Sequence, residues 1–108
     1  MRILESAERD DMLTFIREKL RITDRLEINE TDDDIQAVID IKDSDTFGII
    51  FSRLEKSSDV KELIDNDEFT SIRASKMYKT VKKPTYIINL LGDLTADTYQ
   101  LVITYNKE

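Results

Sequence analysis

The stretch that decides the fold is TYIINLLGDLTADTYQLVITYN, residues 85 to 106. Residues 85 to 91 are mostly β-branched, aromatic or aliphatic, and residues 98 to 106 alternate apolar with polar side chains, so both segments are predicted to be strands. The segment between them, Gly92 to Asp97, is rich in residues that favour turns. We therefore expect an antiparallel hairpin over these residues.

The residues before this hairpin predict one helix and one further strand. Ser57-Ser58 can cap a short helix over residues 59 to 64. Residues 71 to 80 alternate in a way that favours a strand, although the spacing of Phe69 and Met77 leaves a helix as the alternative. Residues 59 to 106 thus form a unit of one helix and three strands.

The N-terminal half predicts the same order of elements. Ser6 can cap a helix whose apolar face consists of Met12, Phe15, Ile16 and Leu20. Strands are expected over residues 25 to 29, 35 to 42 and 47 to 54, the last two joined by a turn at 43 to 45. Residues 7 to 53 thus form a first unit of the same kind.

Two such units can share one core if their sheets join edge to edge, because each helix and each meander must bury one face. We therefore predict an α+β fold, in which a helix-strand-strand-strand unit occurs twice. The sheet would have six largely antiparallel strands, with two helices on one face and the opposite face open. The 108 residues suffice for a single domain over 1 to 108.

Composition excludes several classes of function. The chain has no cysteine, which removes disulfides, thiolate nucleophiles and zinc-thiolate sites. It has no histidine either, and histidine is the commonest general base and transition-metal ligand. Its 36% charged residues and the absence of a long apolar run suit a cytoplasmic protein with no membrane segment. We expect neither an enzyme nor a cofactor.

One acidic segment superficially resembles a metal-dependent nuclease site. Asp40-Ile41-Lys42 follows three consecutive carboxylates at 32 to 34, and carboxylates with a lysine can hold a divalent ion and orient water. The triplet is short and the rest of such a site is missing, so a solvent-facing strand is the favoured interpretation. With only Gly48 and Gly92, the chain also lacks a glycine-rich phosphate loop. We expect no metal site.

Charge is distributed very unevenly along the chain. The first 68 residues hold 10 basic and 20 acidic side chains, whereas residues 69 to 83 hold five basic side chains and no acidic one. Such a cluster is typical of phosphate contacts, although lysines on an edge strand can also serve only to prevent aggregation. The net charge of −7 would limit indiscriminate binding to nucleic acid.

These observations predict a set of DNA contacts. The expected phosphate contacts are Arg73, Lys76, Lys79, Lys82, Lys83 and Lys107, with Lys42 and Arg53 as equivalents in the first unit. The expected base or groove contacts are Tyr78, Tyr105 and Asn106.

The twofold pattern, the size, the lysine-, asparagine- and isoleucine-rich composition and the missing cysteine together resemble the C-terminal double-wing domain of the MotA family, the middle-promoter transcription activators of T-even bacteriophages. The resemblance covers the whole chain and implies a saddle of antiparallel strands that sits on double-stranded promoter DNA, with helices behind. It also implies a longer activator that contacts the host RNA polymerase sigma factor and a phage co-activator in the cytoplasm of the infected bacterium. No contact residue is carried over from the family.

The acidic side chains allow a different function. A small acidic protein can act as an inhibitor or DNA mimic that binds a basic partner protein. The residues that would form this face are Asp24, Glu27, Glu30, Asp32 to Asp34, Asp40, Asp43 and Asp45.

Overall fold

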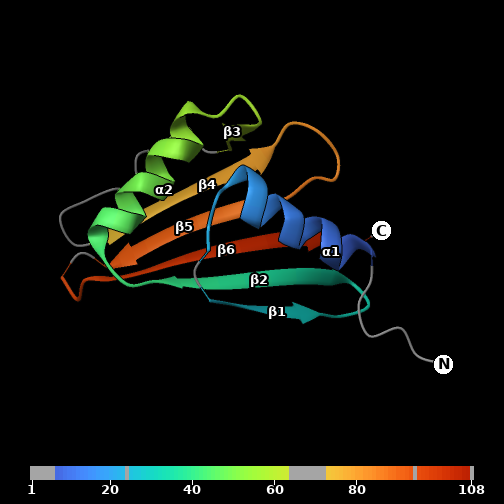
Figure 1. Ribbon diagram of the computed structural model, residues 1–108, viewed down its shortest axis with the longest axis horizontal. Helices are drawn as coiled ribbons and strands as arrows, with labels where there is room; N and C mark the ends of the chain where they lie inside the picture. The colour runs from blue at the N-terminus through green and yellow to red at the C-terminus, as the bar shows by residue number, and fades with distance from the viewer. Residues whose placement is uncertain (1–6, 24, 64–72, 94, 108) are drawn as a thin grey trace.

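A computed structural model describes residues 7–23, 25–63, 73–93 and 95–107 of the chain (Figure 1). The helices are α1 (Ala7–Thr14), its π-helical continuation η1 (Phe15–Lys19) and α2 (Ser44–Lys56). The strands are β1 (Leu26–Glu30), β2 (Asp34–Ile41), β3 (Val60–Glu62), β4 (Arg73–Thr80), β5 (Ile87–Asp93) and β6 (Thr98–Asn106). None of the described helices is long and apolar enough to cross a membrane.

The six strands form one antiparallel sheet in the order β1-β2-β6-β5-β4-β3. The last strand of the chain, β6, lies in the interior of the sheet between β2 and β5 (Figure 1). Because β2 and β3 lie on opposite sides of the β6-β5-β4 block, α2 carries the chain across the sheet between them. The fold class predicted from the sequence, α+β with a six-stranded antiparallel sheet, is confirmed.

Both helices cover the same face of the sheet, and the core lies between them and the strands (Figure 1). Met12 and Ile16 contribute from the first helix, and alternate strand residues such as Ile39, Leu101 and Ile103 are completely buried in the same core. Burying an aliphatic side chain of this size contributes roughly 1.5–3 kcal/mol. The hydrophobic alternation of the strands therefore decides which of their faces the helices cover.

The other face of the sheet, called the open face below, carries the residues between the core positions. By register and alternation they are Glu27, Asn29, Asp34, Gln36, Val38, Asp40, Lys61, Ser75, Met77, Lys79, Ile87, Asn89, Leu91, Asp93, Thr98, Gln100, Val102, Thr104 and Asn106, none of which is buried. The open face is the surface on which a partner could lie flat against the strands.

The segment predicted as a third strand, residues 47 to 54, belongs to helix α2 instead. The Asp43 side chain accepts a hydrogen bond from the Thr46 N–H at 2.7 Å and so caps the helix. Phe47, Ile50 and Leu54 then fall on one buried face. The strand prediction was wrong because apolar side chains at five of these eight positions are compatible with both the helical and the strand period.

The short helix predicted over residues 59 to 64 is replaced, in its described part, by strand β3. Val60 lies opposite Thr80, and the Leu63 N–H donates to the Met77 carbonyl at 2.9 Å. The six strands are therefore divided as two before α2 and four after it, and not as three and three. Pairing with β4 outweighs the weak helical preference of a segment this short.

Gly92 lies within β5, and the turn predicted over 92 to 97 begins later. A Cβ at this position would lie 2.8 Å from the Tyr99 ring, which is the cross-strand neighbour of Gly92. Tyr99 in turn packs on Phe47 of α2, with ring centroids 4.4 Å apart. The glycine is thus explained by an aromatic ring that covers the strand. The hairpin of β5 and β6 itself is as predicted.

Candidate nucleic-acid interface

The predicted contact residues on β4 lie on two different faces of the sheet. Alternation directs Lys76 and Tyr78 towards the helices, whereas Lys79 belongs to the open face. Arg73 begins the strand, with its backbone paired to Asp93. One basic segment of the sequence is therefore divided between a covered and an uncovered surface.

Tyr78 does not reach the surface at all. The residue is only 1% exposed, and its hydroxyl donates a hydrogen bond to the carboxylate of Glu55 on α2. Burial, followed by this hydrogen bond, raises the pKa of the Tyr78 hydroxyl far above its ordinary value. The prediction that Tyr78 contacts bases was wrong, because the ring is part of the core.

Lys76 is engaged by neighbouring side chains. Its Nζ lies 2.7 Å from Oε1 of Glu62 on β3 and 5.9 Å from the ring centroid of Phe51 on α2. The Lys76 side chain is 12% exposed. A lysine neutralised in this way joins β3, β4 and α2 and contributes little charge to a phosphate site, contrary to the prediction.

Of the three predicted residues at the end of β6, one packs against an aromatic ring and two lie beside acidic residues. Tyr105 faces the helices and packs edge-on against Tyr86, with centroids 5.9 Å apart. Lys107 pairs with Glu30 at 2.6 Å, and the hydrogen bond to Glu30 raises the pKa of the lysine. Asn106 is exposed opposite Asp34. These residues are separated from β4 by β5, so they do not extend its basic surface, contrary to the prediction.

Lys79 has a neighbour on the open face that the sequence analysis missed. Lys61 of β3 is its direct cross-strand partner, and neither lysine side chain forms an ion pair or hydrogen bond with a described residue. Like charges in directly opposed positions destabilise a sheet. Lys61 was overlooked because residues 59 to 64 had been interpreted as a helix, and only the alternation of Val60, Lys61 and Glu62 pointed to a strand.

Lys82 and Lys83 lie on an exposed loop between β4 and β5 that buried contacts hold in place. The Thr80 hydroxyl donates to the Pro84 carbonyl at 3.1 Å and accepts from the Tyr86 N–H at 2.8 Å. The two lysines are thus displayed on a supported loop at the end of the strand that carries Lys79. The name "lysine edge" is used below for Lys61, Lys79, Lys82 and Lys83.

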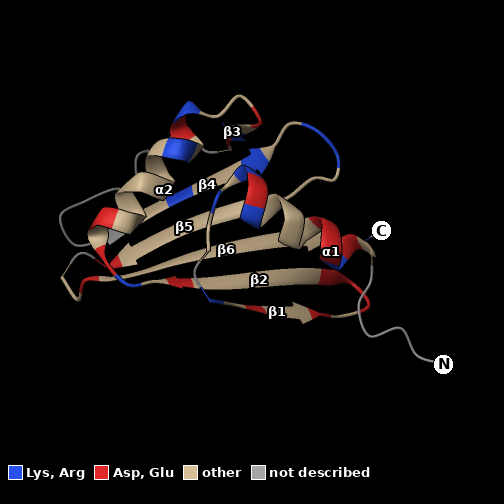
Figure 2. Ribbon diagram, in the orientation of Figure 1, with Lys and Arg blue, Asp and Glu red and all other residues tan. Residues whose placement is uncertain are grey.

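The opposite edge of the sheet is acidic, as Figure 2 shows at the β1–β2 turn. Several carboxylates of the proposed acidic face have structural contacts: Asp43 caps α2, Asp40 accepts from the Gln100 amide at 3.3 Å, and Asp34 accepts from the Thr31 hydroxyl at 3.1 Å. Asp24 of the proposed acidic face lies outside the described residues. Within the described ranges, no three carboxylates come together as ligands for a metal ion.

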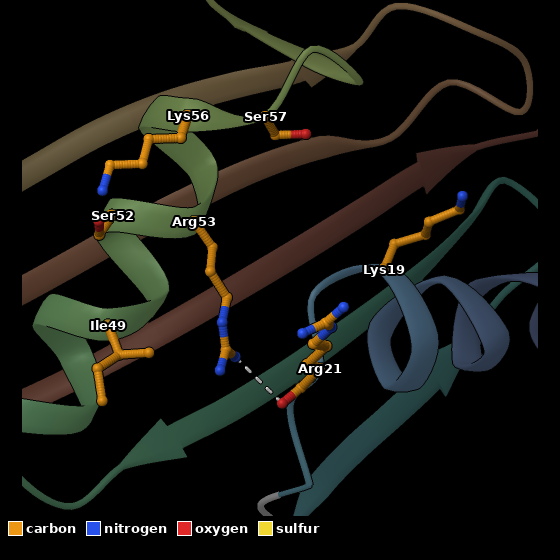
Figure 3. Close-up of a pocket in the computed structure, with 7 residues that line it drawn as sticks. All are labelled: Lys19, Arg21, Ile49, Ser52, Arg53, Lys56 and Ser57. Atoms are coloured by element: carbon orange, nitrogen blue, oxygen red, sulfur yellow. Dashed lines mark hydrogen bonds between the residues drawn. The ribbon is translucent and has the colours of Figure 1, made fainter.

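A second group of basic residues gathers on the helix side, at the C-terminal ends of the first helix and α2 (Figure 3). It surrounds a hollow of about 480 Å³. The lining residues are Lys19, Arg21, Ile49, Ser52, Arg53, Lys56 and Ser57. Of its four cations only Arg53 was predicted as a phosphate contact. Lys42, the other phosphate contact predicted in the first unit, is exposed just beyond β2, on the far side of β6 and β5 from the lysine edge.

The sheet thus has a basic edge and an acidic edge, with small polar and apolar residues between them on the open face. Comparisons with models of protein families, with curated proteins and with solved structures find no match to this chain.

Proposed function

We propose that this protein binds double-stranded DNA, with the lysine edge holding backbone phosphates. The observation that carries the proposal is the direct opposition of Lys61 and Lys79 on an uncovered face, without a carboxylate from any described residue to neutralise them. Their repulsion is an unfavourable term in the free protein, and a bound phosphate would relieve it. Binding energy would thus be gained at a position that costs stability in isolation.

Base contacts would come from the polar side chains of the open face. Asn89 lies at the centre of this face, between Met77 of β4 and Val102 of β6. An asparagine amide can donate to and accept from the edge of an adenine. Ser75 and Gln100 lie next to this position on the neighbouring strands. This set replaces Tyr78 and Tyr105, whose rings face the helices.

The acidic edge would limit affinity for DNA in general. The chain carries a net charge of −7, so a duplex is repelled unless it approaches from the lysine edge. Such a distribution suits a domain that binds one site in one orientation. Following the resemblance to the MotA family, we propose promoter DNA as the target, in a non-enzymatic phage activator whose full-length form contacts the sigma factor and the co-activator.

A salt titration tests the proposal. If the four lysines of the lysine edge each neutralise one phosphate, the logarithm of the binding constant for a promoter-like duplex should fall against the logarithm of salt concentration with a slope of about −3.6. Lys61→Ala and Lys79→Ala should each flatten this slope by about 0.9, and the double variant by about 1.8.

Arg25→Ala provides the control, because this substitution removes the same charge at an exposed position. Arg25 lies before β1, at the other edge of the sheet. The control variant should leave the slope unchanged. The proposal fails if the lysine variants bind duplex with the slope of the unmodified chain. Binding to basic proteins in place of duplex DNA would instead favour the acidic inhibitor.

A further inference from the structure

The hollow on the helix side concentrates positive charge in a chain that is acidic overall. Four of its lining residues are cations and none is acidic. Helix C-termini meet at this place, and each carries a partial charge equivalent to roughly −0.5. Four full positive charges exceed the combined partial charge of two helix ends several-fold. The local field of the described residues therefore favours an anion.

Arg21 occupies a backbone conformation that favours other residues. Its φ angle is 55°, in the left-handed region, at the position just after the end of the first helix. Glycine or asparagine is the usual residue there, because a β-carbon is unfavourable at positive φ. The Arg21 side chain is exposed and forms no hydrogen bond or ion pair with a described residue. No hydrogen bond or ion pair of this side chain within the described chain explains why an arginine stands at this strained position.

Hydrogen bonds within the chain fix the position of the Arg53 side chain beside the hollow. Its Nη1 donates to the carbonyls of Leu20 at 2.9 Å and Arg21 at 3.2 Å, and Figure 3 shows it reaching across the hollow from α2. A guanidinium has five N–H donors, and these bonds use one nitrogen alone. A side chain already fixed in place loses little entropy when it binds an anion.

Lys19 and Lys56 lie on opposite rims of the hollow, with their ammonium groups directed away from its centre (Figure 3). Neither ammonium group forms a hydrogen bond or ion pair with a described residue, so each can swing inward on its flexible stem. Ser52 and Ser57 add hydroxyl groups on the α2 side. Guanidinium, ammonium and hydroxyl groups are the donors that commonly form hydrogen bonds to the oxygens of tetrahedral phosphate groups.

We propose that this hollow is a phosphate-binding site, centred on Arg21 and Arg53 and completed by Lys19 and Lys56. The site is on the helix side, whereas Lys61 and Lys79 lie on the open face, so it does not depend on the proposed function. The phosphate can belong to a soluble polyphosphate compound or to a nucleic-acid backbone, and both present the same chemistry to these side chains.

The test uses a variant that should not harm the fold. Arg21→Asn removes the guanidinium and places a residue that tolerates positive φ at the helix end, so its melting temperature should equal or exceed that of the unmodified chain. Arg25→Asn is the matched control, with the same change of charge at an exposed position outside the hollow. Both proteins are titrated with sodium tripolyphosphate and, separately, with a short DNA duplex.

We expect tripolyphosphate to bind the unmodified chain, and Arg21→Asn to raise its Kd by about tenfold or more, as for a lost charge-assisted hydrogen bond. Lys56→Gln should weaken binding in the same direction, and Arg25→Asn should leave it unchanged. Weaker duplex binding by Arg21→Asn would identify backbone phosphate as a ligand, and an effect on tripolyphosphate alone would identify a soluble compound. Equal binding of tripolyphosphate by Arg21→Asn and the unmodified chain, or no binding by either, would overturn the proposal.

Discussion

Neighbouring residues of strand β4 differ in burial and in charge pairing, according to the face of the sheet on which they lie. On the helix side of β4, Tyr78 is buried and hydrogen-bonded, and Lys76 is paired with Glu62. One residue further along, Lys79 lies on the open face beside Lys61 without an acidic partner among the described residues. The difference teaches that a basic side chain becomes available for binding only where no second layer covers its face.

The largest expected contrast lies on β6, in the interior of the sheet. Ile103 is completely buried under the helices, whereas its neighbour Val102 is half-buried on the open face. Ile103→Ala should lower the free energy of unfolding by about 2–5 kcal/mol, because it leaves a cavity in the core, and Val102→Ala should cost less than about 1 kcal/mol. Urea unfolding of both variants measures the difference. Similar losses for the two would mean that the open face is covered by something else.

A smaller loss is expected where an aromatic ring lies against the strand. In Gly92→Ala the new methyl group would lie 2.8 Å from the Tyr99 ring, so the ring and Phe47 beneath it must shift. Such overpacking typically costs about 1–3 kcal/mol. Thermal unfolding followed by circular dichroism would detect it. The slope of duplex binding against salt should not change in the folded fraction, since Gly92 faces the helices; a changed slope would contradict the separation of the two faces.

The smallest effect is expected from Tyr78→Phe, which keeps the ring and removes one hydrogen bond to Glu55. The loss should be about 1 kcal/mol at neutral pH, without any effect on duplex binding. A shallower slope of the duplex binding constant against salt concentration in this variant would restore Tyr78 as a contact residue.

The same variant has a specific dependence on pH. The pKa of Tyr78 is raised in the folded protein, so above a pH of about 10 the unfolded chain loses this proton while the folded chain keeps it. The contribution of this group to the free energy of unfolding is therefore complete below that pH and is lost as pH rises. The free energy of unfolding of Tyr78→Phe should fall less steeply with pH than that of the unmodified chain. Part of the decline should remain, because burial also raises the pKa of Tyr86 to about 12. The urea concentration at the midpoint of unfolding, measured from neutral to alkaline pH, tests this expectation. An identical change of the midpoint with pH in the two proteins would contradict it.

Much of the fold follows from local patterns. Residues 35 to 42 and 98 to 106 alternate so regularly that only a strand buries their apolar side chains on one face, and both are strands. Residues 47 to 54 have apolar side chains on too many positions to distinguish the two periods. There the cap by Asp43 and the packing of Phe47, Ile50 and Leu54 on the sheet decide for a helix.

The candidate sites could be predicted only in part. The alternation of β4 shows that Lys76 and Tyr78 share one face and that Lys79 lies on the other. Unlike the other long strands, β4 has apolar and polar residues on both faces, so its own sequence does not show which face the helices cover. The cations of the helix-side hollow come from residues 19 to 21 and 53 to 56, which are brought together by a bond from Arg53 to the end of the first helix. No spacing within either segment predicts that contact.

The sequence by itself determined the α+β class, the strand faces and the uneven distribution of charge, because periodicity and composition are local properties of a chain. Only the tertiary structure decided which lysines are paired and which of the described lysines stand without an acidic partner. The physical reason is that the cost of burying a charge and the partner that neutralises it both depend on segments distant in the chain, as Glu62 and Phe51 are for Lys76.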